Sequence, residues 1–375
     1  MITKFLPLPA DSGGKQRSLA ILRRLAALGE VTLCAFDDGR ANHEALADLG
    51  VEVRATPWSP RPSAALRAGS VTVGRFRDHA LAEAVGAESQ RQPPDVLQVE
   101  YLQMAPYAHG IGAGLRVIDL HNVESGLVAS QSRSRQQPAA AAMRAEAAML
   151  RLHERRARRH FDVVTVVSKE DAEAMPGHGG EVIVCPNGVN HTTQLPPSDE
   201  PVVVFIALLG WAPNAHAAVW LARDIWPQVR RRLPDATLRL VGRDPGPEVR
   251  RLEGPGISVA GNVADVMPHL VDARIAVAPL RSGGGTRLKI LEALAVGRPV
   301  VSTTVGAEGL SDLVGEGLVL ADGTIAFADA LVDLLLDPLR CTDLGGRGHD
   351  AVQSRYLWDA TLAPLLDRIR VTERS

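Results

Sequence analysis

Short apolar runs alternate with segments of helical periodicity along almost the whole chain. In the first half, the helical pattern Ser18–Leu28 lies between the runs Ile2–Leu8 and Val31–Phe36, and the pattern Ala139–His160 lies between the runs Arg116–Leu120 and Val163–Val167. The alternation continues in the second half, where the predicted strands are Val202–Leu208, Thr237–Val241, Ile257–Ala260, Ile275–Ala278, Pro299–Ser302 and Leu318–Leu320. Short apolar strands that alternate with helices predict an α/β fold built on parallel sheets with crossover helices.

The length of the chain predicts more than one such sheet. At about 150 residues per domain, 375 residues correspond to two or three domains. The polar, proline-containing segment HTTQLPPSDEP, residues 191–201, lacks periodicity and is interpreted as a linker. We therefore expect one Rossmann-like domain over residues 1–190, a second over 201–355, and a C-terminal helix over 356–371 that returns to the first domain. Ligands of such sheets bind beyond the carboxyl ends of the strands.

Composition excludes several classes of protein. Hydrophobic residues make up 46% of the chain and charged residues 22%, which is ordinary for a folded soluble protein. The net charge of −2 lacks the basic excess of a nucleic-acid-binding protein. No apolar run reaches the roughly 18 residues of a membrane span, and the N-terminal MITKFLPLPADSGGKQ turns polar too early for a secretory signal. A cytoplasmic protein is expected.

The sequence contains no pattern that is typical of a metal centre or a disulfide framework. Cys34, Cys185 and Cys341 are scattered and odd in number, so we expect reduced thiols and neither disulfides nor a CxxC metal site. No Asp-x-Asp motif follows a predicted strand. We expect no metal and no cofactor.

The segment APLRSGGGTRLKILEALAVGRPVV, residues 278–301, carries the clearest functional pattern. It predicts a strand, a glycine loop, a helix and a second strand. The glycines allow close approach of the backbone to a ligand, and the helix start offers unpaired N–H groups to an anion. Arg287 and Lys289 add positive charge where the helix dipole favours acidic residues, which indicates a phosphate-type ligand. The structural alternative is a tight turn with solvated basic residues.

This segment resembles a known family, the retaining nucleotide-sugar-dependent glycosyltransferases of the GT-B fold. The resemblance is to the family 4 type, which includes sucrose synthases and mannosyltransferases. The family's Glu-Ala-Met-Ala and Gly-x-Pro-Val-Val motifs correspond to Glu292–Ala295 and Gly297–Val301. Further matches occur in the same order, at Gly13-Gly14, His121–Glu124, Val166–Ser168, Pro186–Val189, Val241–Arg243, Val259–Val263 and Val305–Gly309. The resemblance implies two Rossmann-like domains facing a cleft.

The resemblance also implies the roles of the residues around the glycine loop. Glu292 would accept hydrogen bonds from the donor ribose, and Arg287, Lys289 and the helix N–H groups would stabilise the departing diphosphate. The loop residues expected to bind the donor are Gly284, Gly285, Thr286 and Leu288. The family has a sugar-contacting glutamate eight positions before Glu292, but this chain has Gly284 there. One side chain that reads the donor sugar is therefore absent.

A second departure concerns the loop after the first strand of the C-terminal domain. Many members of the family carry an arginine and a lysine there that clamp the diphosphate, whereas this chain, aligned on Gly210, offers Trp211 and His216. Trp211 is expected either to line the donor site or to pack under the loop. Arg243, which follows the strand ending at Val241, is a further candidate for donor binding.

In the N-terminal domain, the candidate residues follow predicted strands. Gly13 and Gly14 would let the backbone approach the donor, and Lys15 would either contribute charge toward the acceptor or be solvated. His121 follows the strand ending at Leu120, and the resemblance places it close to the donor sugar as a catalytic residue; the alternative is a histidine bonded within its loop. Glu100 is a candidate for acceptor contact.

Residues Met143–Arg159 predict an amphipathic helix with six arginines. Such a helix lies either on an anionic membrane or, more commonly, in solvent with internal ion pairs. Peripheral contact with the inner face of the membrane is therefore left open but not favoured.

The resulting expectation is a metal-independent retaining transferase that moves a sugar from a UDP- or GDP-sugar to a hydroxyl acceptor. One alternative is a GT-B nucleotide-sugar epimerase, which would use carboxylate acid/base pairs. Another is a non-catalytic two-lobed ligand-binding protein. The segments Arg54–Ser70 and Gly126–Pro138 are interpreted as acceptor loops, and they identify neither the acceptor nor the oligomeric state.

Overall fold

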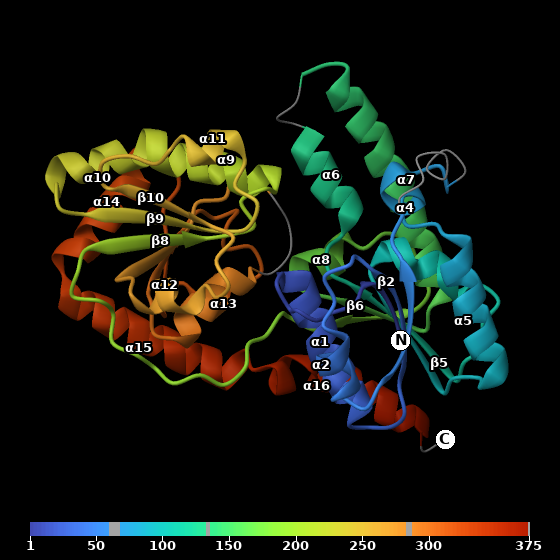
Figure 1. Cartoon of the computed structure of the whole chain (residues 1–375). Coiled ribbons are helices and arrows are strands. Elements are labelled where there is room, and N and C mark those ends of the chain that lie inside the picture. The colour runs from blue at the N-terminus through green and yellow to red at the C-terminus, as the bar shows by residue number, and fades with distance from the viewer. Residues whose placement is uncertain (60–67, 133–135, 283–286, 374–375) are drawn as a thin grey trace. The chain divides into compact units, whose positions relative to one another are not determined.

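The computed structural model in Figure 1 describes residues 1–59, 68–132, 136–282 and 287–373. Two compact units are present, one formed by Met1–Pro186 with Leu362–Ser375 and the other by Asn187–Thr361. Each unit holds one parallel sheet, of seven strands in the first unit and six in the second. The predicted α/β class with two Rossmann-like sheets is confirmed.

The sheet of the first unit has the strand order β3-β2-β1-β4-β5-β6-β7. Its strands are β1 (Ile2–Phe5), β2 (Thr32–Asp37), β3 (Glu52–Pro57), β4 (Val96–Glu100), β5 (Leu115–Leu120), β6 (Val163–Val166) and β7 (Glu181–Val184). The helices are α1 (Gly13–Ala26), α2 (His43–Ala47), α4 (Val71–Gly74), α5 (His79–Arg91), the 3-10 segment η1 (Leu102–Ala108), α6 (Glu124–Ser132), α7 (Ala139–His160) and α8 (Lys169–Ala174).

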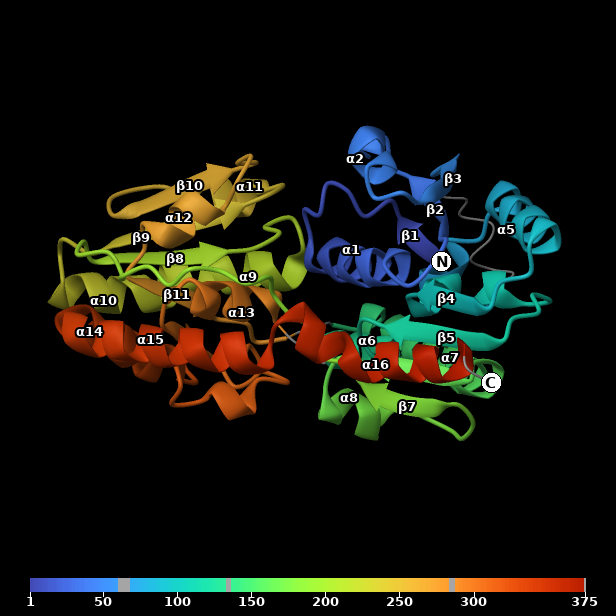
Figure 2. The ribbon, with the colours of Figure 1, turned by 90° about the horizontal axis from the view of Figure 1, so that it is seen from below.

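The sheet of the second unit has the order β10-β9-β8-β11-β12-β13, and Figure 2 labels its strands β8 to β11. Its strands are β8 (Val202–Ile206), β9 (Thr237–Gly242), β10 (Ile257–Gly261), β11 (Ile275–Ala278), β12 (Val300–Ser302) and β13 (Leu318–Leu320). The helical segments are α9 (Ala212–Trp220), the π-helical η2 (Leu221–Ile225), α10 (Trp226–Arg232), α11 (Pro247–Arg250), α12 (Met267–Val271), α13 (Leu288–Ala295), the 3-10 segment η3 (Ser311–Leu313), α14 (Thr324–Leu336) and α15 (Pro338–Arg355). The last helix, α16 (Trp358–Glu373), begins in the second unit and ends in the first.

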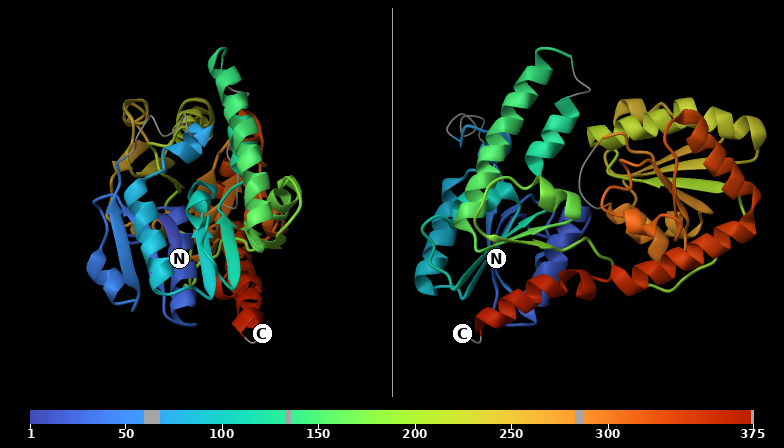
Figure 3. Two further views of the ribbon diagram at one scale, coloured as in Figure 1. Left: turned by 90° about the vertical axis from the view of Figure 1, so that its right-hand side faces the viewer. Right: turned by 180° about the vertical axis from the view of Figure 1, so that it is seen from behind.

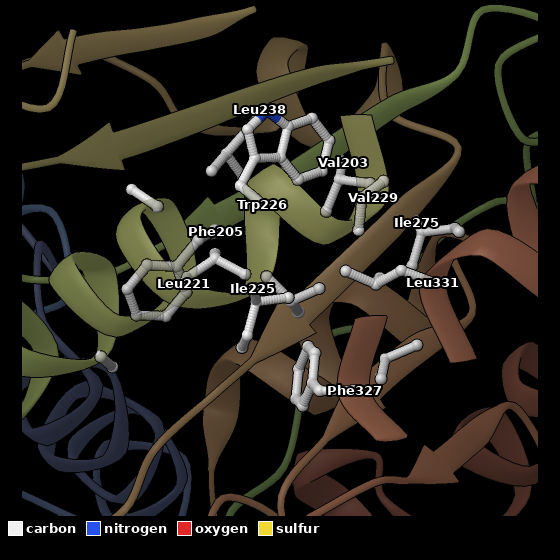
Figure 4. Close-up of a cluster of buried hydrophobic side chains, with 14 of the residues drawn as sticks. Val203, Phe205, Leu221, Ile225, Trp226, Val229, Leu238, Ile275, Phe327 and Leu331 are labelled. Carbon is white, nitrogen blue, oxygen red and sulfur yellow. The ribbon is translucent and has the colours of Figure 1, made fainter. Parts of the chain in front are cut away.

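Large apolar side chains hold the second unit together. Figure 4 shows Trp226 and Ile225 of the α9–α10 segment packed between the strands and Phe327 of α14. Trp226 is 1% exposed, and its Nε1–H donates to the Gly256 carbonyl at 3.1 Å, so the one polar atom of this side chain is satisfied inside the core. Burial of such side chains contributes on the order of 2 kcal/mol each to the stability of the second unit.

Each sheet has one place where the strand order reverses, between β1 and β4 in the first unit and between β8 and β11 in the second. In doubly wound sheets, loops leave the two central strands in opposite directions at this point and ligands bind there, so we call the carboxyl ends of these two strand pairs the β1–β4 crevice and the β8–β11 crevice. The fold therefore places two candidate sites at the carboxyl ends of these strand pairs.

The structure differs from the sequence prediction at the linker and in one loop. The chain passes from the first unit to the second after Pro186, so residues 191–201 belong to the second unit. Arg298 donates to the Leu195 carbonyl at 2.7 Å, which ties this segment to the second unit. The predicted acceptor loop Gly126–Pro138 contains most of helix α6, so that interpretation as a loop is wrong. The other predicted acceptor loop, Arg54–Ser70, begins inside strand β3, which ends at Pro57, so its predicted start is also wrong. Residues 60–67 of this segment lie outside the described part of the chain.

Helices α6 and α7 pack against each other and project together from the sheet of the first unit (Figure 3). Both glutamates of α7 turn inward: Glu154 accepts from Ser125, and Glu146 accepts from Ser70 and Thr72. Arginines 144, 151, 155, 156 and 159 are exposed. Among the described residues, no helix is long and apolar enough to cross a membrane.

Cys34, Cys185 and Cys341 are buried free thiols, as predicted.

Candidate active site

Helix α13 places two cationic side chains at the β8–β11 crevice. The helix follows β11, and Arg287 is its N-cap residue, which is 8% exposed and within 3.9 Å of a Glu308 carboxylate oxygen. The half-buried Lys289 lies with its Nζ atom 4.9 Å from the centre of the Phe205 ring on β8. Lys289 also donates to Asn214 Oδ1 at 3.1 Å. The positive charges of these two side chains and the N–H groups of the helix start are the groups that bind oxyanions in proteins.

Burial changes the protonation behaviour of Lys289. Removal from water disfavours the ammonium form and neighbouring Arg287 repels it, so the pKa of Lys289 falls to about 7, although Glu292 acts in the opposite direction. A diphosphate in contact with Nζ would favour the ammonium. Glu292 itself is half-buried on α13, one turn after Leu288. Arg287 and Lys289 thus lie at the start of α13, and Glu292 lies in its middle.

The loop between β8 and α9 supplies the opposite wall of the crevice. Trp211 is the half-buried N-cap residue of α9, whereas His216 is exposed. The Arg243 carbonyl accepts from the Leu209 N–H at 2.8 Å, so the backbone after β9 supports the loop after β8. Gly242 allows this contact, because at its φ of +146° a Cβ would lie 1.7 Å from the Ala207 carbonyl oxygen.

A buried ion pair lies at the β1–β4 crevice of the first unit. The Arg17 guanidinium of α1 donates two hydrogen bonds of 2.7 Å to the carboxylate of Asp119 on β5, and the two side chains are 1% and 0% exposed. Thr165 of β6 also bonds to this carboxylate, and Arg17 donates to the Pro186 carbonyl at 3.2 Å. Although burial opposes ionisation, Arg17 outweighs it and holds the pKa of Asp119 below its usual range.

His121 completes this cluster. Its Nε2 lies 2.9 Å from Glu100 Oε2 and 3.2 Å from Asp119 Oδ2, and its ring stacks on Tyr101 with 3.7 Å between centroids. Burial lowers the pKa of His121 to about 3, so the imidazole is neutral at physiological pH. Because Nε2 faces two carboxyl groups, it carries the ring proton, and Nδ1 is left as an acceptor.

Glu100 does not reach the surface of the first unit. It is 0% exposed, accepts from Gln98 at 2.8 Å and from Ser18 at 3.4 Å, and lies behind His121. Burial and the nearby Asp119 raise its pKa well above the usual range. The geometry therefore fits a residue that orients His121 better than the predicted contact with an acceptor.

The glycine pair opens helix α1 as predicted, after the N-cap residue Ser12. At Gly14 a Cβ would lie 2.3 Å from the Tyr101 hydroxyl oxygen, so the close approach of α1 to the His121–Tyr101 stack requires glycine. Gly13 precedes it in the same turn. Lys15 is nearly buried and pairs with Asp38 at 3.2 Å. Its positive charge is therefore already engaged within the first unit.

The side chains of Glu100, Asp119 and His121 each present one potential metal-ligand atom, all within 4.8 Å of one another. Arg17 already donates two hydrogen bonds to Asp119, so a cationic group is built into this cluster.

The predicted donor-binding residues Gly284, Gly285 and Thr286 lie outside the described residues. Sequence reasoning missed Asn214, Tyr101 and Asp119, whose contacts join distant parts of the chain.

Two family models cover most of the chain. Residues 12–188 match the glycosyl transferase 4-like domain, and residues 200–337 match the glycosyl transferases group 1 model. The chain belongs to the GT4-type glycosyltransferases of the GT-B fold. The boundary between the two matches coincides with the boundary between the two units.

Individual relatives align with a smaller part of the chain than the two family models do. A GDP-mannose-dependent alpha-(1-6)-phosphatidylinositol monomannoside mannosyltransferase of Mycolicibacterium smegmatis is 33% identical over 187 residues, which are 45% of this chain and 48% of the relative. The aligned region thus spans about half of that relative's length.

Among solved structures, sucrose-phosphate synthase of Thermosynechococcus elongatus aligns with a TM-score of 0.74 at 20% identity, over 100% of this chain and 99% of the other. The Anabaena protein HepE in complex with UDP and glucose aligns with a TM-score of 0.70 at 16% identity, over 99% and 100%. These likenesses show the fold of this glycosyltransferase.

Proposed function

We propose that this GT4-type protein is a retaining hexosyltransferase that moves a sugar from a UDP- or GDP-sugar to a hydroxyl acceptor without a metal ion. The observation that carries the proposal is the pair Arg287 and Lys289 at the start of α13, on the β8–β11 crevice. The mannosyltransferase relative is GDP-mannose-dependent, and the HepE structure holds UDP and glucose. Both support a nucleotide-sugar donor.

The proposed chemistry uses the second unit for the donor. The bond between the anomeric carbon and the diphosphate oxygen breaks, and negative charge grows on the diphosphate. Arg287, Lys289 and the N–H groups of α13 stabilise that charge. The acceptor oxygen attacks from the face that the diphosphate leaves, and its proton passes to a diphosphate oxygen, so no enzyme nucleophile is required.

The first unit is proposed to bind the acceptor. A neutral His121 with Nδ1 as acceptor is suited to receive a hydrogen bond from a sugar hydroxyl, and Glu100 and Asp119 keep its ring in one orientation. The direct test is incubation with a panel of nucleotide sugars and hydroxyl acceptors, followed by mass spectrometry and by NMR of the new anomeric centre. Transfer with retained configuration supports the proposal. Nucleotide release without a glycosylated product would favour an epimerase instead.

Substitution of Glu292 by alanine is expected to weaken donor binding by a factor of about ten to one hundred, because hydrogen bonds from the ribose to a carboxylate are charge-assisted. Isothermal titration with UDP and GDP measures the loss. Glu248→Ala, at an exposed glutamate on α11 of the same unit, is the matched control. Unchanged nucleotide affinity in Glu292→Ala would remove this residue from the site.

Transfer is expected to continue at an undiminished rate in EDTA, because Arg287 and Lys289 supply the positive charge that Mg²⁺ supplies in metal-dependent transferases. The rate is measured before and after chelation and again after Mg²⁺ is added back. Complete loss in EDTA that Mg²⁺ restores would overturn the metal-free mechanism, and the Glu100–Asp119–His121 cluster would then be the first place to look for the ion.

A further inference from the structure

The Lys289 ammonium is held by a residue of the opposite wall of its crevice. Asn214, in the first turn of α9, is 4% exposed and uses both ends of its amide. Its Nδ2 donates to the Leu208 carbonyl at 2.9 Å, and its Oδ1 accepts from Lys289 Nζ at 3.1 Å. The first bond fixes which end of the amide faces Lys289. Asn214 thus connects the loop after β8 to the helix after β11.

We propose that Asn214 is a positioning residue that holds the Lys289 ammonium at the β8–β11 crevice, ready for the diphosphate of the donor. The inference rests on the proposed function and adds to it a residue that contacts no reacting atom. Its basis is geometric: a buried amide, fixed by its bond to the loop that precedes α9, accepts from the cation proposed to meet the leaving group.

An amide suits this task better than a carboxylate would. A buried ammonium needs a hydrogen-bond acceptor, because burial without one is costly. A carboxylate would satisfy that need but would neutralise the charge and compete with the diphosphate. The Asn214 oxygen is neutral, so it accepts from the Lys289 ammonium without cancelling the charge that the ligand needs. The Phe205 ring beneath Nζ is also uncharged, so it attracts the ammonium without cancelling the positive charge.

The charged groups that face Lys289 determine how its protonation responds to a change at Asn214. Burial and Arg287, the N-cap residue of α13, lower the pKa of Lys289, and Glu292 in the middle of the same helix raises it. On the opposite side, Lys289 contacts Asn214 and Phe205, and neither side chain is charged. Donor affinity is therefore full below the Lys289 pKa of about 7 and declines as pH rises through that value, since the diphosphate favours the ammonium.

The experiment measures the affinity of UDP-glucose and GDP-mannose and the turnover number between about pH 6 and 8.5, in wild type, Asn214→Ala, Asn214→Asp and Lys289→Ala. The diphosphate bridge of these donors has no group that titrates in that range, so a pH-dependent decline reports on the protein. Asn190→Ala, at an exposed asparagine of the same unit, is the control. Circular dichroism checks that each variant is folded.

We expect Asn214→Ala to lose about tenfold in turnover at pH 8 and to shift the decline in affinity to lower pH, because Lys289 loses its acceptor. Asn214→Asp is expected to weaken binding at pH 6 but to shift the decline to higher pH, because a carboxylate favours the ammonium. Shifts in opposite directions require a direct contact with a titrating lysine. Since aspartate has nearly the size of asparagine, this arm remains informative even if the alanine variant unfolds.

Two results would contradict the inference, and they differ from a failure of the proposed function. If Lys289→Ala impairs turnover while both Asn214 variants behave like Asn190→Ala, Asn214 has no positioning role. The same holds if Asn214→Ala lowers turnover tenfold further in a Lys289→Ala background, since a residue acting through Lys289 has no effect once Lys289 is absent. If Lys289→Ala itself changes neither affinity nor turnover, the proposed diphosphate site is wrong.

Discussion

The double substitution Arg287→Ala/Lys289→Ala is expected to lower turnover by a factor on the order of 10³ while weakening donor binding much less. Charge on the diphosphate grows as the glycosidic bond breaks, so cations at this position act chiefly in the transition state. Loss of one such interaction typically costs about 3 kcal/mol, or on the order of a hundredfold in rate. The two residues lie two positions apart at one helix start, so either can compensate in part for the other.

Single-turnover kinetics of the two single variants and the double variant measure this effect. The control is Arg340→Ala/Arg347→Ala, which removes two exposed arginines from α15 of the same unit. Near-normal turnover of the double variant would mean that α13 begins with a structural turn and that the diphosphate is held elsewhere. Arg243, after β9, would be the next side chain to test.

Substitution of Arg17 by leucine is expected to have the largest effect on stability, a loss of about 3–5 kcal/mol from the first unit. The change leaves the Asp119 carboxylate buried at 0% exposure beside Glu100 and His121, without the two hydrogen bonds of 2.7 Å that Arg17 donates. For a unit of this size, such a loss lowers the melting temperature by roughly 10 °C.

Hydrogen exchange followed by mass spectrometry separates this effect from changes elsewhere, because peptides of the second unit serve as an internal reference. The control is Arg116→Ala, on the same strand as Asp119. Arg116 pairs with Asp162 at 3.2 Å, but both partners are at least one-third exposed, so at most about 1 kcal/mol is lost. If Arg17→Leu opens the first unit no more than Arg116→Ala does, the buried pair contributes little to stability.

The elements that sequence reasoning placed well are those whose signal is local. The predicted bounds of α7 and β11 match the structure, because α7 has a long amphipathic pattern and β11 is a continuous apolar run. Helix α6 was missed because GLVASQS has no clear periodicity. Its stability comes from packing on α7 and from the bonds between Ser125 and Glu154, which are 29 residues apart in sequence.

In the candidate site, too, the residues grouped by a local signal were predicted and those joined only by the fold were not. Arg287, Lys289 and Glu292 lie on one helix, so their spacing and the family resemblance were sufficient to group them. Asn214 lies 75 positions from Lys289, and Arg17 lies 102 positions from Asp119, so only the fold brings these pairs together. Proximity to a strand end suggested a ligand role for Glu100, but whether such a side chain points outward or into the core depends on its neighbours.

The most direct test of the account is thermal stabilisation by nucleotide sugars in EDTA, compared between wild type and Arg287→Ala/Lys289→Ala. A ligand at one hundred times its dissociation constant stabilises the native state by about 2.7 kcal/mol, so the true donor class produces a clear rise in melting temperature. We expect UDP- or GDP-sugars to stabilise the wild type at low concentration and the double variant, whose binding is weakened, to need a higher concentration for the same rise. Absence of stabilisation by any nucleotide sugar, or identical concentration dependence in the two proteins, would contradict it.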